Sequence, residues 1–273
     1  MTMRDPGRLV DVVVVVPARD ESATISPCLR SVRDSLRQAV AAGAVGRIAV
    51  AVVGHNCTDD TLDQAARALS GLPHVLVSDS TSTNVGDVRA LGVRAVLDLL
   101  PRRVVRPYRS AAGRGSPREV WILNTDADSI VPATWVTDVL GAAAGGHQAV
   151  IGMAQLPDPT GMDAVGRQRN PAAVAAYRRI VRNGLHERSH EHVYGANLAV
   201  RADAYAAVGG FGSVSLGEDR ALLDALISHG RPIVRPRGVV VTTSDRRHGR
   251  AVGGLATLLD TLDHACAPDT EGG

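Results

Sequence analysis

The stretch WILNTDADSIV, residues 121–131, begins with large apolar side chains and then presents two carboxylates one residue apart, Asp126 and Asp128. Its apolar part has the length and composition of a strand that is covered on both faces. In open α/β sheets, ligands bind outside the carboxyl ends of such strands. The stretch therefore predicts a central strand with a polar site at its end.

Apolar strands alternate with helical patterns through the first half of the chain. Residues 11–17, 47–53, 74–78 and 119–125 are β-branched or apolar, and the segments between them have helical spacing. Parallel strands need crossover helices, and continuous apolar strands are buried on both faces. We therefore expect an α/β fold with a mostly parallel, Rossmann-like central sheet flanked by helices on both faces.

The second half of the chain is less regular. We expect two strands there, in residues 147–156 and 192–201, and three helices, in residues 170–187, 217–230 and 251–265. Residues 232–244 should form a pair of short strands.

The composition excludes several classes of function. A formal charge of +2 over 273 residues is too small to indicate nucleic-acid binding. All 30 basic residues are arginine, so mechanisms that need a lysine, such as the P-loop or a Schiff base, are excluded. Any phosphate must be held by arginine, backbone amides or a metal.

The cysteines and the hydropathy predict a cytoplasmic protein. The three cysteines, Cys28, Cys57 and Cys266, are far apart and odd in number, which favours a reducing compartment and no zinc site. The chain has no apolar run long enough for a transmembrane helix, and its opening lacks an apolar signal core.

The acidic pair has two interpretations. In an extended backbone, residues i and i+2 point to the same side, so Asp126 and Asp128 would converge and repel unless a cation lay beside them. Magnesium or manganese with a diphosphate meets that requirement. The alternative is that both acids only organise the following turn.

Several motifs in a fixed order make the chain similar to the family 2 glycosyltransferases, which are inverting enzymes with the GT-A fold. They are VVVVVPARDE near the start, NCTDDT, NVGDVRALG, NTDADS, GANLAVRADAYAAVGGF and GEDRAL. The resemblance covers nearly the whole length, and it implies a single domain over residues 1–273. It also implies a nucleotide-sugar-binding half to about residue 128 and a smaller acceptor-binding half over about 129–266. Because chain termini are often poorly ordered, we expect a disordered tail at 267–273.

The resemblance implies that the donor nucleotide lies against the ends of the first two strands. At the first strand end this concerns Pro17, Arg19 and Glu21, with Asp20 where the family usually has Asn. At the second, His55 stands where the family often has an Asp that contacts uracil. A neutral imidazole can bond a base edge but presents no carboxylate, so the donor base stays open.

Three residues open the third helix at the same edge of the sheet: Asn84, Gly86 and Arg89. Backbone amides and an arginine fork suit a phosphate or a ribose. The resemblance implies that this turn contacts the nucleotide. A solvated helix face for Arg89 is the alternative. Asp59 and Asp60, after the second strand, are sufficiently explained as the start of a helix.

The general base is expected at a later helix start, in LGEDRALL. In the family the second acid of this pair, here Asp219, takes the proton of the acceptor hydroxyl, and Glu218 orients or caps. Acids at a helix N-terminus also stabilise the helix dipole without any chemistry, which is the alternative.

The segment 242–254 holds three arginines and a histidine close together. Arg246, Arg247 and Arg250 would close over the diphosphate, and His248 is a candidate third metal ligand, as a C-terminal His is in some GT-A relatives. A solvated histidine is the alternative. Elsewhere the chain has His186, His190 and His192, whose spacing does not indicate zinc ligands.

The prediction is a metal-dependent, inverting, hexosyltransferase-type enzyme that moves a sugar from a nucleotide-diphosphate donor to a hydroxyl acceptor, by single displacement. The acceptor, whether small molecule, glycan or lipid-linked, stays open, as do a homodimer and a peripheral membrane contact by the arginine-rich loop 101–118. The alternatives are a sugar-phosphate nucleotidyltransferase and a silent nucleotide-sugar-binding protein. A haloacid-dehalogenase-like phosphatase needs a lysine and is excluded.

Overall fold

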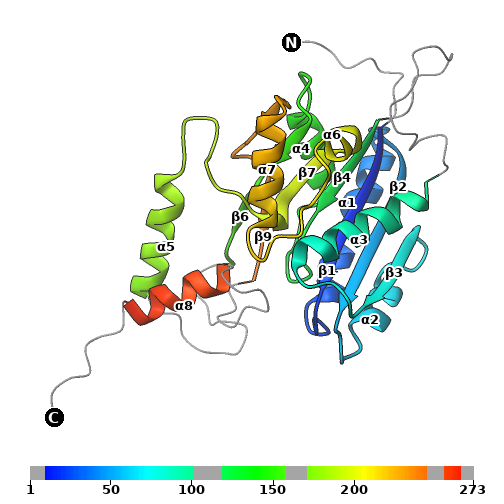
Figure 1. Cartoon of the computed structure of the whole chain (residues 1–273), viewed down its shortest axis with the longest axis horizontal. Coiled ribbons are helices and arrows are strands. Elements are labelled where there is room, and N and C mark those ends of the chain that lie inside the picture. The colour runs from blue at the N-terminus through cyan, green and yellow to red at the C-terminus, as the bar shows by residue number, and fades with distance from the viewer. Residues whose placement is uncertain (1–9, 101–118, 158–170, 245–254, 266–273) are drawn as a thin grey trace.

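The computed structural model describes residues 10–100, 119–157, 171–244 and 255–265, which form a central sheet of seven strands (Figure 1). In the order in which they lie side by side, these are β3 (His74–Asp79), β2 (Val45–His55), β1 (Val10–Ala18), β4 (Val120–Asn124), β7 (Leu198–Arg201), β5 (Ala149–Ile151) and β8 (Ile233–Val234). Only β7 runs antiparallel to its neighbours. The sheet is therefore mostly parallel, as expected.

The valine run of β1 explains why this strand lies inside the sheet. Its centre is fully buried, and Val13 pairs with Ala49 of β2 on one side and with Ile122 of β4 on the other. Alternate valines pack into different clusters: Val12 and Val14 into one, Val13 into the other. A strand buried in this way needs apolar side chains along its centre, and residues 12–16 are all valine.

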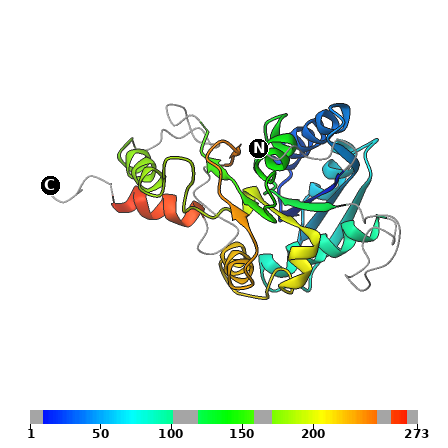
Figure 2. The same ribbon diagram turned by 90° about the horizontal axis from the view of Figure 1, so that it is seen from above.

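Helices cover both faces of the sheet (Figure 2). One apolar cluster packs α1 (Ile25–Ala41), α2 (Thr61–Ala68) and α4 (Trp135–Ala142) against the strands. The other packs α3 (Val85–Asp98), α6 (Ala202–Ala207) and α7 (Glu218–Ser228) on the opposite face. The predicted layers are confirmed. The short helices α4 and α6 were not predicted from the sequence.

The prediction of a single strand over residues 147–156 is wrong. The segment breaks at Gly152 into β5 and β6 (Met153–Gln155), and β6 pairs with β9 (Val240–Thr242) in a separate two-stranded sheet. A Cβ at Gly152 would lie 2.2 Å from Nδ2 of Asn197 and 2.7 Å from the carbonyl oxygen of Val239. The close approach of these groups explains why a glycine stands at the break.

The prediction of a strand over residues 192–201 is only partly right. A 3₁₀ turn, η1 (Gly195–Asn197), precedes β7. Asn197 is buried at the junction of the two sheets, where its Nδ2 donates to the carbonyl oxygen of Met153 at 2.9 Å and its Oδ1 accepts from Nε1 of Trp135 at 2.9 Å. A fully bonded buried amide of this kind stabilises the irregular backbone around it.

Two helices lie together beyond the end of the sheet. Figures 1 and 2 both show α5 (Pro171–Asn183) beside α8 (Leu255–Ala265), with Tyr177 and Leu259 buried. Among the described residues, no helix combines the length and the hydropathy needed to cross a membrane.

Gly92 tests the packing of α3 on the sheet. A Cβ there would lie 2.6 Å from Cγ1 of Val15 and 3.0 Å from Cγ2 of Val53, so we expect Gly92→Ala to lower the free energy of unfolding by about 1–3 kcal/mol. At Gly141 in α4, an added Cβ would meet nothing within 4 Å. The control Gly141→Ala should therefore be neutral or stabilise by up to about 1 kcal/mol. Urea denaturation measures both, and equal effects would contradict the packing argument.

Candidate functional site

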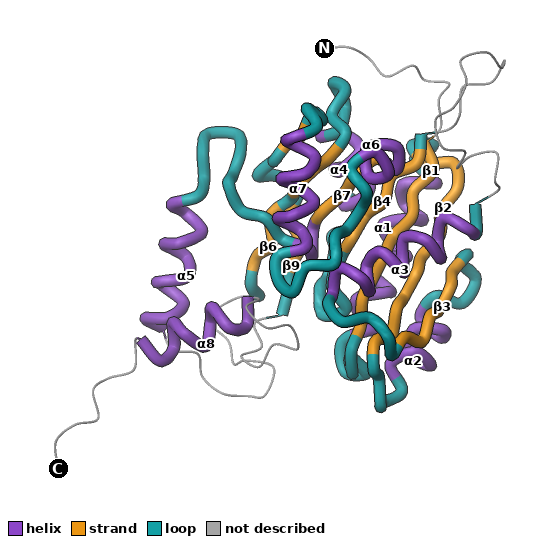
Figure 3. The backbone as a smooth tube through the Cα atoms, in the orientation of Figure 1, coloured by secondary structure: helices purple, strands orange, loops and turns teal. Residues whose placement is uncertain are grey.

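The carboxyl ends of the parallel strands β1, β2, β3 and β4 meet at one edge of the sheet, and the loops that follow β1 and β2 lie together there (Figure 3). Pro17 is half-buried near the end of strand β1, and Arg19 is exposed just after the strand. The sheet topology therefore brings the sequence-predicted strand-end residues to one region.

Two residues with left-handed backbone shape the turns after β1 and β2. Asp20 and Asn56 both have φ of 49°, which Asp and Asn tolerate better than most residues. Oδ1 of Asp20 accepts from the backbone N–H of Thr58 at 2.7 Å, and this bond lowers the pKa of Asp20. The backbone N–H of Ser22 donates to Oδ2 of Asp59 at 3.1 Å. The two turns are thus fastened to each other.

Glu21 and Asp59 are held by their neighbours. The backbone N–H of Glu21 donates to Oγ1 of Thr61 at 2.7 Å, and its buried carboxylate accepts from Oγ1 of Thr24 at 2.8 Å. Oδ1 of Asp59 accepts from the backbone N–H of Thr61 at 3.0 Å, so Asp59 shapes the start of α2, as expected. Ligand atoms of Asp20, Cys57 and Asp59 lie within 4.8 Å of one another. The carboxylates of Asp20 and Asp59 accept hydrogen bonds from backbone N–H groups, and these bonds account for the cluster.

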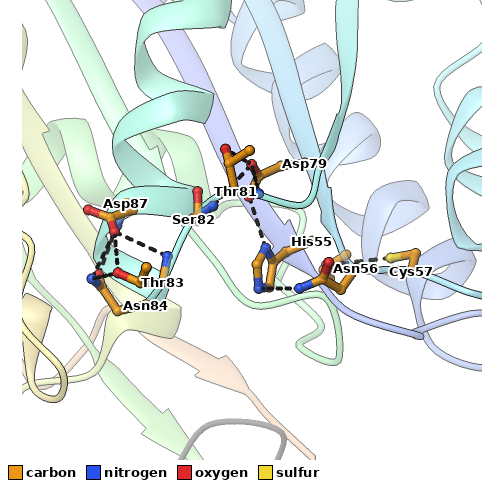
Figure 4. Close-up of polar contacts among 10 residues, drawn as sticks. His55, Asn56, Cys57, Asp79, Thr81, Ser82, Thr83, Asn84 and Asp87 are labelled. Carbon is orange, nitrogen blue, oxygen red and sulfur yellow. Dashed lines mark hydrogen bonds and ion pairs between the residues drawn. The ribbon is translucent and has the colours of Figure 1, made fainter.

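His55 is oriented by an acid that was not predicted as part of the site (Figure 4). Nδ1 of His55 lies 2.9 Å from Oδ2 of Asp79, and Nε2 lies 3.0 Å from the amide nitrogen of Asn56. Asp79 also accepts from the backbone N–H groups of Thr81 and Ser82. Burial raises the pKa of Asp79, but its bonds with Ser82, Thr81 and His55 outweigh burial and lower it. Since an ionised carboxylate only accepts, Nδ1 of His55 holds the proton and Nε2 accepts from Asn56.

The start of α3 contacts a loop from the second half of the chain. Asn84 is the N-cap: its Oδ1 accepts from the backbone N–H of Asp87 at 3.0 Å, and its Nδ2 donates to Oγ of Ser213 at 3.0 Å. A Cβ at Gly86 would lie 2.6 Å from the carbonyl oxygen of Gly212. The glycine of this motif is thus explained by a close backbone approach.

Arg89 is buried, so the alternative of a solvated helix face is wrong. Its Nη2 donates to Oδ1 of Asp126 at 2.6 Å, and its Nε donates to Oε1 of Glu218 at 3.2 Å. Burial lowers the pKa of Arg89, but the charges of Asp126, Glu218 and Asp219 outweigh burial and raise it. Three acids from two distant segments therefore surround one guanidinium.

The acidic pair lies in a turn, and the extended backbone assumed for it is wrong. The backbone N–H of Ser129 donates to the carbonyl oxygen of Asp126 at 3.0 Å, which closes a turn that includes Asp128. The thiol of Cys28 donates to the carbonyl oxygen of Asp126 at 3.3 Å, and burial, followed by the charges of Asp128 and Asp126, raises the pKa of this thiol. The side chain of Asp126 is 38% exposed. Two carboxylates on an accessible turn are ligands that Mg²⁺ or Mn²⁺ accepts, so the residues fit such an ion.

The expected base stands in the first turn of α7. Glu218 is buried, which raises its pKa; Arg89 acts against this, whereas Asp219 adds to it. Asp219 is half-buried, and its Oδ1 accepts from the backbone N–H of Arg220 at 2.7 Å. Of the two acids, Asp219 is thus the more accessible, whereas Glu218 bonds inward to Arg89.

The three histidines of residues 186–192 bond to separate groups. Nε2 of His190 lies 2.9 Å from the carbonyl oxygen of Ile151, and Nε2 of His192 lies 2.8 Å from that of Val181. His186 pairs with Glu191.

Several predictions concern residues outside the described ranges. They are the donor-binding roles of Arg246, Arg247 and Arg250, the metal-binding role of His248, and those for the loop 101–118 and the tail 267–273.

Comparisons with known proteins show the fold. A scan against protein-family models gave no match, and neither did a search of curated proteins. Among solved structures, the mannosyltransferase PcManGT from Pyrobaculum calidifontis, in complex with GDP-Man and Mn²⁺, has a TM-score of 0.60 at 17% identity. The match covers 90% of this chain and 60% of that one.

A second similar structure is S. aureus TarS 1-349 in complex with UDP-GlcNAc, with a TM-score of 0.59 at 12% identity. The match covers 93% of this chain and 66% of that one, so the chain spans roughly two thirds of the length of these proteins or less. The chain therefore has the fold of nucleotide-sugar glycosyltransferases, the GT-A fold, and the fold prediction is confirmed.

Asp79 tests the network around His55. Asp79→Asn replaces a buried carboxylate that accepts several bonds, so we expect a loss of about 1–3 kcal/mol in the free energy of unfolding at pH 7. Folding lowers the pKa of Asp79, so its stabilisation is present above the unfolded pKa, about 4, and is lost as the pH falls below that value. The difference between wild type and variant should shrink in acid, as measured by urea denaturation from pH 7 to pH 3.

The exposed Asp98, at the end of α3, provides the control. Asp98→Asn should change the free energy of unfolding by less than about 0.5 kcal/mol. A loss for Asp79→Asn that stayed constant down to pH 3 would contradict the assigned charge state.

Proposed function

We propose that the protein is a metal-dependent, inverting glycosyltransferase of the family 2 type, which transfers a hexose from a nucleotide-diphosphate sugar to a hydroxyl acceptor. The observation that supports this best is the convergence of Asp126, Glu218 and Asp219 around Arg89 in a GT-A fold. A glycosyl transfer needs a charge-neutralising group at the leaving diphosphate and a base at the acceptor. Asp126 is a candidate ligand for the metal ion that would serve the first need, and Asp219 is a candidate for the base.

The donor nucleotide is proposed to lie over the turns after β1 and β2 and against the start of α3. Pro17, Arg19 and Glu21 border this region on one side, and the ring of His55 borders it on another. Asn84, Gly86 and Arg89 would border it on the α3 side. Two structures with this fold hold GDP-Man and UDP-GlcNAc, which supports a nucleotide sugar without choosing the base.

Asp126 and Asp128 are proposed to hold Mg²⁺ or Mn²⁺, with His248 as a further candidate. When bound, the ion would neutralise charge on the leaving diphosphate. Asp126 already shares one oxygen with Arg89, so its other oxygen and Asp128 are the groups proposed for the ion. The Mn²⁺ bound with GDP-Man in PcManGT supports this assignment.

Asp219 is proposed as the general base. As the acceptor oxygen forms its bond to the anomeric carbon, the bond from that carbon to the diphosphate oxygen breaks on the opposite face. The hydroxyl proton moves to a carboxylate oxygen of Asp219, and the nucleoside diphosphate leaves. This is a single displacement, which inverts the anomeric centre. The half-buried position of Asp219 in the first turn of α7 supports the role.

A donor panel tests the proposal as a whole. Wild-type protein with Mn²⁺ is incubated with UDP-glucose, UDP-GlcNAc and GDP-mannose, and the release of nucleoside diphosphate is measured with and without chelator. We expect metal-dependent release from at least one donor. Formation of nucleoside triphosphate and sugar 1-phosphate when pyrophosphate is added would indicate a nucleotidyltransferase instead, and binding without turnover would indicate a silent nucleotide-sugar-binding protein.

Asp128 tests the metal site. Asp128→Ala should abolish the Mn²⁺-dependent part of donor binding, a loss of at least about 10-fold in affinity, because one of two carboxylate ligands is removed. Titration calorimetry with the donor from the panel, with and without Mn²⁺, measures it. The exposed Asp138 of α4 is a matched control, and Asp138→Ala should bind as wild type does. Wild-type affinity in Asp128→Ala would remove this acid from the proposed site.

Asp219 tests the base. Asp219→Asn should keep donor affinity within about threefold and lower turnover by at least about 100-fold, since general-base catalysis contributes that much or more. Calorimetry measures the first quantity and nucleoside diphosphate release the second. Asp224 lies on the same helix and is exposed, so Asp224→Asn should leave both unchanged. Turnover near the wild-type rate in Asp219→Asn would refute the assignment.

A further inference from the structure

Arg89 joins two segments that are far apart in the sequence. It extends from α3, Asp126 follows β4, and Glu218 begins α7. The bond to Asp126 spans 37 positions of the sequence and the bond to Glu218 spans 129. Only 3% of the Arg89 side chain is exposed. One buried cation thus fixes the separation between the acidic turn and the helix that bears Asp219.

The geometry of the guanidinium matters for this contact. Two different nitrogens serve two different carboxylates, Nη2 for Asp126 at 2.6 Å and Nε for Glu218 at 3.2 Å. A planar fork can hold two partners at a defined angle, whereas an ammonium group is a single point charge. Arg89 therefore sets an orientation as well as a charge balance.

The surrounding backbone holds the fork in place. A Cβ at Gly195 would lie 2.7 Å from Nη2 of Arg89 and 3.5 Å from Oε1 of Glu218. A Cβ at Gly86 would lie 3.1 Å from Cβ of Glu218. Both positions are glycines, so the backbone of η1 and the backbone of α3 close tightly around the ion pairs.

A second contact, made by Ser213, also connects α3 to the segment before α7. Oγ of Ser213 donates to Oδ2 of Asp87 at 3.3 Å and accepts from Nδ2 of Asn84 at 3.0 Å. The first turn of α3 is therefore attached to the segment before α7 on the surface, while Arg89 attaches it inside. The two contacts together attach α3 to the first turn of α7 and to the segment before it.

We propose that Arg89 is a positioning residue of the transfer reaction. By holding Asp126 and Glu218 at once, it places the metal-side acid and the first turn of α7 so that Asp219 faces the acceptor while the donor is bound. The inference rests on the proposed function. It assigns Arg89 an effect on turnover through two carboxylates, in place of direct capture of a donor phosphate or ribose.

Kinetics of matched variants test the role. With the donor from the panel and Mn²⁺, Arg89→Lys should lower kcat by at least about 10-fold and change the donor KM by less than about threefold, because the lysine keeps the charge but not the fork. Arg89→Met should be lower again. Arg94 is exposed on the same helix, and Arg94→Lys should match wild type. Circular dichroism at the assay temperature identifies variants that are folded.

A double-mutant cycle shows whether Arg89 acts through Glu218. Glu218→Gln removes the partner charge with little change of shape. If the two residues act together, their effects on kcat should not multiply. The kcat of the combined Arg89→Lys and Glu218→Gln variant should then be at least about 10-fold above the value expected from multiplying the two single fold-losses. Independent effects would overturn the inference. A merely structural contact would lower the melting temperature of the variants but leave kcat per folded molecule unchanged.

Three further outcomes would also decide whether Arg89 positions the two acids. A donor KM raised more than about 10-fold in Arg89→Lys at unchanged kcat would show direct donor binding and overturn the positioning role. A wild-type kcat in a folded Arg89→Lys would overturn it as well. An inactive wild-type protein would refute the proposed function first, and the inference would fall with it; active wild type with active variants refutes the inference alone.

Discussion

The ion pairs of Arg89 are the constraint on which the arrangement of the site depends. A buried guanidinium is stable only while its charge is compensated, and here Asp126 and Glu218 do this from two sides. Breaking a buried pair by removing one partner typically costs about 3–5 kcal/mol. The three residues therefore form one electrostatic unit, and each can move only if the others move with it.

The reversed strand explains how this unit can form. β7 runs antiparallel between β4 and β5, so the chain returns along the sheet and enters α6 and then α7 on the face that α3 also covers. Asn197 stabilises the start of this return by bonding to Met153 of the two-stranded sheet, to Val239 beside it and to Trp135 of α4. Because η1 begins at Gly195, next to Arg89, the same few residues connect the sheet junction to the buried charges.

The parts of the fold that could be predicted are those with long, regular patterns. The valine run of β1 and the stretch before Asp126 are buried on both faces, and each position shows it. α6 has only six residues, too few for a periodic pattern to stand out. Gly152 is the local sign of the break, but the group that requires a glycine there, the side chain of Asn197, is distant in sequence.

The same limit applies to the site. Strand ends and helix starts could be placed, because parallel strands bring them to one edge, and Asn84 does cap α3. The partners of these residues depend on tertiary packing. Arg89 faces inward to Asp126 and Glu218, and His55 bonds to Asp79 because β2 and β3 pair in that register. An acid at the end of the strand beside His55 was the signal that could have revealed Asp79.

The pairing of α5 with α8 has a consequence for how such a protein can diversify. These helices pack against each other beyond the rim of the sheet, and their buried Tyr177 and Leu259 lie outside the two apolar clusters that hold the sheet and its covering helices. Mutations that reshape this outlying pair can therefore accumulate while the charged centre is preserved.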